Sequence, residues 1–191
     1  MEMIRLATWI DAPVELCFLL SLSIDLHVAS TRSSGEKAIG GVTSGLISEG
    51  ETVTFQARHL GWRRRHTSRI EVLRPYCHFR DVMVAGSFRH FEHDHYFATM
   101  DDGTRMRDEV RFSATWGPVG RMLARRQLKA LLQERNAVIK RVAESEEWRK
   151  YLDGGVVGRL AATWAAPERG WHSLGLLRAV GEIALPRVPN G

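Results

Sequence analysis

The residues best suited to chemistry in this sequence are histidines and one aspartate in two neighbouring segments. His93 and His95 are separated by one residue, and Asp108 follows after the dipeptide Asp102-Gly103. Because residues i and i+2 of a strand point to the same face, both imidazoles belong to one face. A histidine beside a carboxylate can act as a general base, so His95 and Asp108 are candidate catalytic residues. Two histidines and one carboxylate can also hold a metal ion.

Asp102-Gly103 is typical of the two-residue turn that joins antiparallel strands. With this turn, Asp101 pairs with Thr104, Phe97 faces Asp108 and His95 faces Val110. His95 and Asp108 are then diagonal neighbours, about 7–8 Å apart at Cα. The more apolar face of the two strands contains Phe91, His93, His95, Phe97, Met106, Asp108, Val110 and Phe112.

A second hairpin is predicted at Leu60-Gly61, where His59 pairs with Trp62 and Phe55 with His66. His59, Trp62, Arg64 and His66 then share the inner face of the sheet. A dry core would not accept so many polar side chains, because each costs free energy unless it is hydrogen-bonded or solvated. We therefore expect a partly polar pocket on this face.

The sequence does not decide which side chains of the strand at 79–85 point to the inner face of the sheet. A type II′ turn at Gly86-Ser87 would point Arg80, Val82 and Val84 inward. A three-residue loop would instead point Phe79, Asp81 and Met83 inward.

The elements that must position these residues follow from periodicity. Residues 3–10 alternate as a strand, and two short helices are expected over 14–20 and 21–29. Turn signals about every ten residues between 35 and 116 predict a meander of antiparallel strands. Apolar residues at helical spacing predict one long amphipathic helix from 119 to about 152. The fold class is thus α+β, a curved antiparallel sheet wrapped around a long C-terminal helix in the helix-grip arrangement.

Two residues of the long helix, Arg135 and Asn136, are within reach of the sheet. An ion pair on the helix surface is the more common outcome for such residues, and we expect it here. We expect residues 1–153 to form one ligand-binding domain, and residues 154–191 to be an accessory tail.

Composition narrows the class of protein. The 191 residues are 44% hydrophobic and 26% charged, as in ordinary globular domains. The longest mainly apolar stretch, residues 16–24, is too short to span a membrane, so we expect a cytoplasmic protein. Cys17 and Cys77 are then structural thiols. The net charge of +5 permits contact with nucleic acid without requiring it, and we expect no specific nucleic-acid partner.

Three segments, 35–61, 79–97 and 102–112, resemble the polyketide cyclase/dehydrase-like branch of the START/Bet v 1 (SRPBCC) superfamily. The pattern is F-x-D-x-x-x-x-G-x-[FY]-x-x-[FW]-x-H-x-H-x-F, followed by D-G-T-x-x-x-D. It is matched by Phe79, Asp81, Gly86, Phe88, Phe91, His93, His95, Phe97, Asp102, Gly103, Thr104 and Asp108. The resemblance covers residues 1–150 and implies the helix-grip fold with a ligand cavity. It brings no metal or other cofactor, and we expect none.

These observations favour a carrier or sensor of a small hydrophobic or aromatic molecule over an enzyme. The alternative is a cyclase or dehydratase that uses His/Asp acid–base chemistry in the same cavity. A monomer or a homodimer fits either function. The residues expected to contact the ligand are His59, Trp62, Arg64, His66, Phe91, His93, His95, Phe97, Asp108 and Phe112.

Overall fold

The computed structural model describes residues 1–59, 62–113 and 117–152, so the tail expected at 154–191 lies outside the described residues. The strands are β1 (Glu2–Ile10), β2 (Lys37–Gly41), β3 (Thr52–His59), β4 (Trp62–Arg74), β5 (His78–Ala85), β6 (His90–Met100) and β7 (Gly103–Ser113). The helices are α1 (Val14–Leu22), α2 (Ile24–Ser30) and α3 (Gly117–Ala143), with short 3₁₀ helices η1 (Arg32–Ser34) and η2 (Glu146–Lys150).

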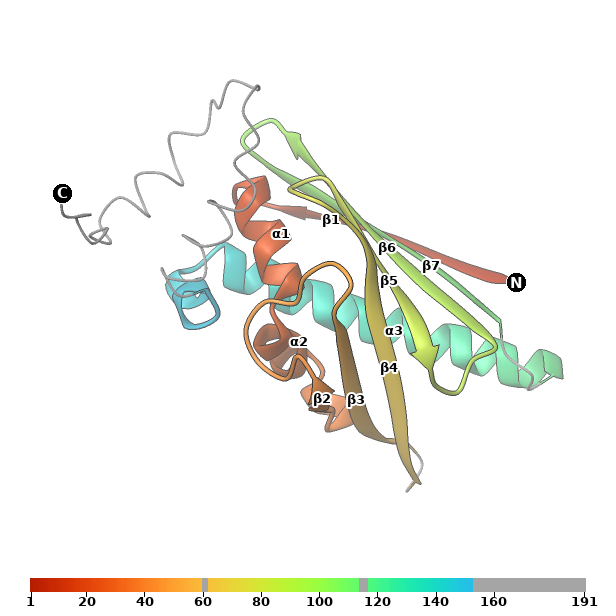
Figure 1. Cartoon of the computed structure of the whole chain (residues 1–191). Coiled ribbons are helices and arrows are strands. Elements are labelled where there is room, and N and C mark those ends of the chain that lie inside the picture. The colour runs from red at the N-terminus through yellow and green to blue at the C-terminus, as the bar shows by residue number, and fades with distance from the viewer. Residues whose placement is uncertain (60–61, 114–116, 153–191) are drawn as a thin grey trace.

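The seven strands form one antiparallel sheet in the order β1-β7-β6-β5-β4-β3-β2. The sheet curves around α3, while α1 and α2 close one end (Figure 1). Register shifts in the pairing of β4 with β5 and of β2 with β3 mark bulges. Such bulges bend a strand and increase its twist, which helps the sheet to wrap around a helix. This arrangement confirms the predicted helix-grip fold.

The long helix is shorter than the sequence predicts. It ends at Ala143, and η2 follows as a separate element. At the break, the side chain of Ser145 accepts a hydrogen bond from the backbone N–H of Glu147, which caps a new helical start. The four residues 144–147 are all polar, and they interrupt the apolar spacing at this point.

The core beneath α1 is built around Phe18, which is fully buried. Its ring meets the rings of Phe79, Phe97 and Tyr76 edge-on, at centroid distances of 5.3–5.7 Å. Edge-to-face contacts of this kind stabilise a core beyond the burial of apolar area. They join α1 to the central strands and fix that end of the sheet.

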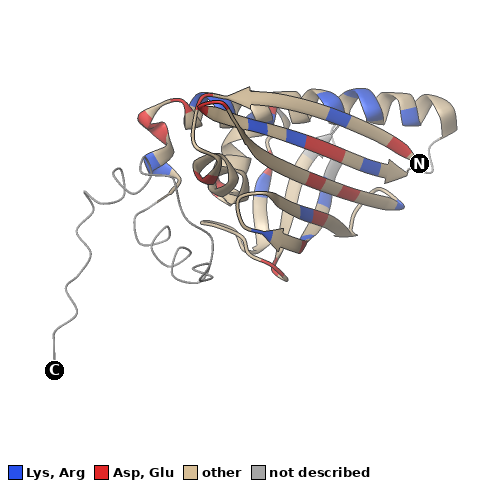
Figure 2. Ribbon diagram, turned by 90° about the horizontal axis from the view of Figure 1, so that it is seen from above, with Lys and Arg blue, Asp and Glu red and all other residues tan. Residues whose placement is uncertain are grey.

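Positively and negatively charged residues recur along the strands of the sheet (Figure 2). On the outer face of the sheet, Asp94 has no solvent exposure. Its carboxylate accepts hydrogen bonds from the guanidinium groups of Arg80 and Arg111 at 2.8 Å, and lies 2.8 Å from His78 Nε2. Burial alone would raise the pKa of Asp94, but these hydrogen bonds hold it below its ordinary value.

The pairing of β6 with β7 differs from the predicted register by two residues. Met100 pairs with Gly103, so the turn residues are Asp101 and Asp102, and Asp101 takes the left-handed conformation at φ 51°. Gly103 therefore lies in the strand, where a Cβ would come within 2.6 Å of the backbone oxygen of Ile10. Glycine is needed here because β1 lies close to this position, and Gly103 is not a turn residue. A shift of two residues leaves every side chain on its predicted face.

Cys17 and Cys77 are both free thiols, the first buried and the second exposed. No helix among the described residues is long and apolar enough to cross a membrane.

We predict that Gly103→Ala lowers the free energy of unfolding by about 2 kcal/mol, because the new methyl group collides with the backbone of β1. Gly40→Ala is the matched control, since its Cβ would meet nothing closer than Thr54 Cβ at 3.5 Å. That variant should be unchanged or up to about 1 kcal/mol more stable. Urea unfolding of both variants measures the difference, and equal stabilities would contradict the proposed role of Gly103.

Candidate functional site

The candidate site is centred on Asp108, a fully buried carboxylate in β7. Its Oδ2 accepts a hydrogen bond from Asn136 Nδ2 at 2.7 Å, and its Oδ1 lies 2.9 Å from His93 Nε2. Arg135 Nη1 reaches the same Oδ1 at 3.5 Å. Because Arg135 and Asn136 belong to α3, this one carboxylate joins the helix to the sheet. The expectation of a surface ion pair for these two residues is wrong, since both are buried.

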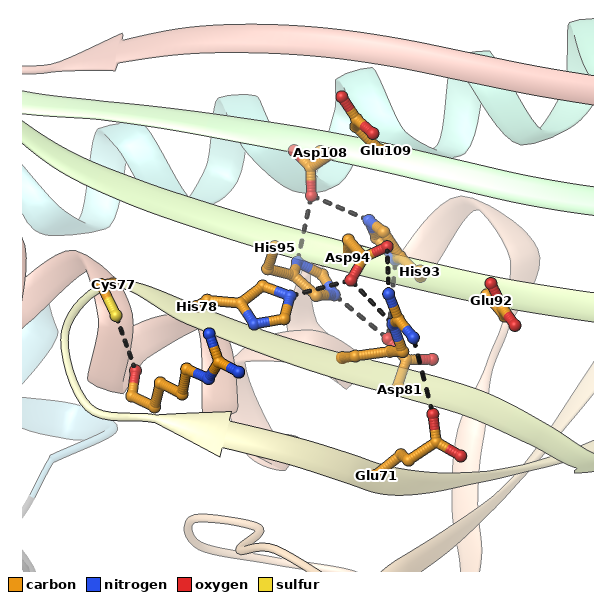
Figure 3. Close-up of polar contacts among 12 residues, drawn as sticks. Glu71, Cys77, His78, Asp81, Glu92, His93, Asp94, His95, Asp108 and Glu109 are labelled. Carbon is orange, nitrogen blue, oxygen red and sulfur yellow. Dashed lines mark hydrogen bonds and ion pairs between the residues drawn. The ribbon is translucent and has the colours of Figure 1, made fainter.

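The imidazoles of His93 and His95 lie between Asp108 and a second carboxylate, Asp81 of β5 (Figure 3). His95 Nε2 is 3.1 Å from Asp81 Oδ2, and His95 Nδ1 is 3.0 Å from Asp108 Oδ1. His95 Nδ1 is nevertheless buried without an aligned hydrogen-bond partner. His93 Nδ1 is 3.7 Å from Asp81 Oδ2. Both rings therefore face a carboxylate oxygen at each of their nitrogens.

The polar network continues to a third histidine in β4. Ser68 Oγ donates to Asp81 Oδ1 at 3.2 Å and lies 2.9 Å from His66 Nε2. The edge of the Phe91 ring packs against the imidazole of His66. A continuous series of polar groups thus runs from β4 through β5, β6 and β7 to α3.

The electrostatics of this network favour ionised carboxylates and a neutral His93. Burial alone would raise the pKa of Asp81, but its hydrogen bond with His95 and the nearby imidazoles hold that pKa well below the ordinary value. Asp108 follows the same pattern: its hydrogen bond with His93 and the adjacent imidazole of His95 lower its pKa. Burial lowers the pKa of His93, and the adjacent His95 lowers it further. Burial also lowers the pKa of the Arg135 guanidinium.

A cavity of about 720 Å³ lies between the sheet and α3, and the network forms part of its wall. The apolar part of the wall comprises Leu22, Ile24, Ile47, Val53, Phe55, Ala57, Ile70, Phe79, Phe88, Phe91, Leu123, Ala124, Leu128, Leu131 and Leu132. Asp81, His93, His95 and Arg135 are among its polar residues. Arg64, Arg65 and Leu123 line the cavity and are also exposed to solvent, so they mark its rim.

The structure distributes the predicted ligand-contacting residues over three places. Arg64, His66, Phe91, His93 and His95 line the cavity. Phe97, Asp108 and Phe112 are buried behind its wall, in contact with the core or with the lining imidazoles. His59 and Trp62 pair as predicted, but their side chains lie outside the described residues. Direct contact of any of these residues with a ligand stays a prediction.

In the observed register, the catalytic candidates His95 and Asp108 lie closer together than in the predicted one. His95 pairs directly with Asp108 across β6 and β7, and His93 pairs with Val110. On the other side of β6, His93 pairs with Asp81 and His95 with Phe79. Phe79 and Asp81 therefore point into the cavity, which resolves the question left open for the strand at 79–85.

Two important residues of the site, Asp81 and Arg135, were not among the predicted site residues. Asp81 matches the F-x-D element of the family pattern, so that pattern contained the signal. Asp81 also falls on the correct face under one of the two turn alternatives. Arg135 carries no comparable signal, because a cation in an amphipathic helix ordinarily faces solvent.

No family model matches the sequence, and no curated protein matches it. Several solved structures are similar to it. The protein TTHA0849 from Thermus thermophilus is 17% identical, covers 86% of this chain and 100% of its own, and has a TM-score of 0.54. A START superfamily protein from Mycobacterium smegmatis is 10% identical, with coverages of 73% and 98% and a TM-score of 0.54. The di-domain aromatase/cyclase StfQ of the steffimycin biosynthetic pathway is 12% identical, with coverages of 74% and 50% and a TM-score of 0.61.

These likenesses establish the class of fold. The chain has the helix-grip fold shared by START and Bet v 1-like proteins, as the resemblance of its motifs implies. At these identities the likeness concerns the fold, and function must be argued from the site itself.

We predict that Asn136→Leu lowers the free energy of unfolding by about 2–3 kcal/mol, because it leaves an oxygen of the buried Asp108 carboxylate without its donor. Gln133→Leu, an exposed change on the same helix, is the control and should fall within about 0.5 kcal/mol of the parent protein. Chemical denaturation compares the two. Similar losses in both variants would show that Asn136 does not support Asp108.

Proposed function

We propose that the protein binds a small hydrophobic or aromatic molecule in the cavity between the sheet and α3, as a carrier or sensor. The observation that carries this proposal is the cavity itself. Its volume of about 720 Å³ lies within the range of small-molecule sites, about 300–1,000 Å³. Its wall combines many apolar side chains with polar ones, and the buried polar network around His93 and His95 forms one part of it. This is the composition expected of a ligand site.

The apolar walls supply affinity. Aromatic rings of β3, β5 and β6, including Phe55, Phe79 and Phe91, face leucines of α3 across the cavity. A flat or elongated apolar ligand between these layers would lose contact with water on both sides. Transfer of apolar area from water stabilises such a complex by about 25 cal/mol per Å².

The polar groups orient the ligand. Asp81 and Asp108 are already matched by hydrogen bonds from Ser68, Asn136 and the histidines. A further anion would be repelled by these two carboxylates, so a free carboxylate is a poor fit. The arrangement favours a ligand whose polar end is a hydroxyl, phenol or carbonyl group.

The comparisons support this proposal in general terms. One similar structure is a START superfamily protein, and others are the Bet v 1-like proteins Ara h 8.0201 and ginseng major latex-like protein 151. The same arrangement of a long helix against a curved sheet therefore occurs in several other proteins. Identification of the ligand requires its recovery from the protein.

We predict that Ala124→Trp weakens binding of the neutral fluorescent probe N-phenyl-1-naphthylamine at least tenfold, because the indole fills space that the ligand needs. Ala124 lies on the cavity side of α3 and is 7% exposed. Ala130→Trp places the same side chain on the exposed side of the helix and should bind the probe as the parent protein does. Fluorescence titration measures all three proteins.

Mass spectrometry of the same preparations provides an independent check. Native spectra of the parent protein should show a bound apolar molecule, which denaturation then releases for identification. A parent protein that binds no probe and releases no molecule would overturn the proposal. So would an Ala130→Trp variant that loses as much affinity as Ala124→Trp.

A second candidate function is a cyclase or dehydratase that acts on a polyketide-like or aromatic substrate. It is favoured by the direct pairing of His95 with Asp108 at the cavity wall, and one similar structure is an aromatase/cyclase. A histidine held by a carboxylate can remove a proton beside a carbonyl group.

If the protein is such an enzyme, His95→Gln should lower turnover of an aromatisable polyketide about 10²–10⁴-fold while its affinity for the apolar probe stays within about threefold. His90→Gln, on the outer face of β6, should retain full activity. Substrate consumption followed by chromatography provides the measurement. Absence of turnover in the parent protein would leave ligand binding as the function.

A further inference from the structure

We propose that Asp81, His93 and His95 bind one divalent first-row transition-metal ion at the polar end of the cavity. One ligand atom from each of the three side chains lies within 4.8 Å of the other two. Two imidazoles and one carboxylate form a recurrent ligand set for such ions, with further positions left open. This inference goes beyond ligand binding and departs from the absence of a cofactor that the family resemblance implies.

The distances among the donor atoms suit a metal ion. Asp81 Oδ2 lies 3.1 Å from His95 Nε2 and 3.7 Å from His93 Nδ1. Bonds of about 2.0–2.2 Å to one ion would separate neighbouring donor atoms by about 3–3.5 Å. The three side chains therefore need only small rotations to share one ion. Asp81 and His93 are directly paired across β5 and β6, and His95 lies two residues further along β6 on the same face.

The positions of the imidazole nitrogens also suit a metal ion. Both nitrogens of His93 and both of His95 face carboxylate oxygens, within 2.9–3.7 Å. One nitrogen of each ring faces Asp81, and the other faces Asp108. The Nδ1 of His95 is buried without an aligned hydrogen-bond partner.

A metal ion would give each of these nitrogens a distinct partner. If the nitrogens that face Asp81 coordinate the ion, the nitrogens that face Asp108 carry the N–H groups, because a metal-bound imidazole keeps its proton on the other nitrogen. His93 Nε2 and His95 Nδ1 would then both donate to Asp108 Oδ1, which lies 2.9 and 3.0 Å away. A carboxylate behind each ligating histidine is the usual support of a protein metal site. Asp108 would thus be a supporting carboxylate, whereas the sequence suggests it as the third ligand.

Charge and access agree with this assignment. Asp81 and Asp108 contribute two negative charges, and the nearby Arg135 contributes one positive charge, so a divalent cation is attracted. All three proposed ligands line the cavity. The open coordination positions would therefore face the bound molecule, and an oxygen atom of that molecule could occupy one of them.

The test uses the full chain, stripped of metal with a chelator and titrated with Co²⁺, whose visible spectrum reports its ligands. We expect one equivalent bound in the parent protein, with competition by Zn²⁺. Asp81→Asn and His93→Gln should each weaken Co²⁺ binding at least tenfold. His90→Gln is the matched control, because His90 lies on the outer face of β6, 3.3 Å from Glu92, and should bind Co²⁺ as the parent protein does.

Thermal unfolding provides a second readout that does not depend on activity. Excess Zn²⁺ should raise the Tm of the parent protein and of His90→Gln, since a ligand of the native state stabilises it. The Tm of Asp81→Asn should not respond, and its Tm without metal shows whether it folds. A parent protein that binds less than a tenth of an equivalent of Co²⁺ would overturn the proposal, whatever the variants do. Equal weakening by His90→Gln would also overturn it.

Apolar ligand binding is measured separately with the naphthylamine probe. Binding of the probe without binding of Co²⁺ would support the proposed function and overturn the metal site. Binding of Co²⁺ without binding of the probe would support the metal site and overturn the proposed function.

Discussion

The buried carboxylate of Asp108 is the constraint on which the arrangement of sheet and helix depends. An ionised group removed from water must be matched by donors, and here the donors come from both layers of the fold. Apolar contacts between α3 and the sheet are non-directional and would tolerate sliding. The hydrogen bond from Asn136 is directional, with a donor–acceptor distance of 2.7 Å, and it sets one position of α3 along the sheet.

The interior strand β6 bears buried polar groups on both faces, which is costly unless each is matched by a hydrogen bond or an ion pair. His93 and His95 point to the cavity, and Asp94 between them points to the outer face. Asp94 pairs with Arg80 of β5 and Arg111 of β7, and these two strands are the neighbours of β6 in the sheet. The outer-face ion pairs therefore hold together the same three strands that supply Asp81, the two histidines and Asp108 to the inner face. Stability of the sheet and geometry of the site are linked through β6.

Most of the fold follows from the sequence, because it depends on periodicity, and periodicity survives small errors of register. The inner and outer faces of β6 and β7 were predicted correctly although the pairing was wrong by two residues. The geometry of the site was harder to predict from the sequence, because it depends on that pairing. The direct contact of His95 with Asp108 appears only in the correct register. Gly103 misled the prediction because a turn and a close approach of two strands both favour glycine. Arg135 was assigned to the helix surface because a cation in an amphipathic helix ordinarily faces solvent, and the sequence does not show that it lies opposite Asp108.

The cavity is lined by residues from the N-terminal half and the middle of α3. The buried residues of α3 gather in its C-terminal half, where Ile139 and Val142 enter the core next to Asn136. Towards the N-terminal end, Val119, Met122 and Leu123 are more than half exposed, and Ala124 is too small to fill the space beneath it. In the same half, Ala124 and Leu128 pack with the apolar cluster of Ile4, Val110 and Phe112 and also line the cavity. The histidines that contact the Asp108 carboxylate line the same cavity. The buried charge that positions the helix is therefore next to the groups that would recognise a ligand.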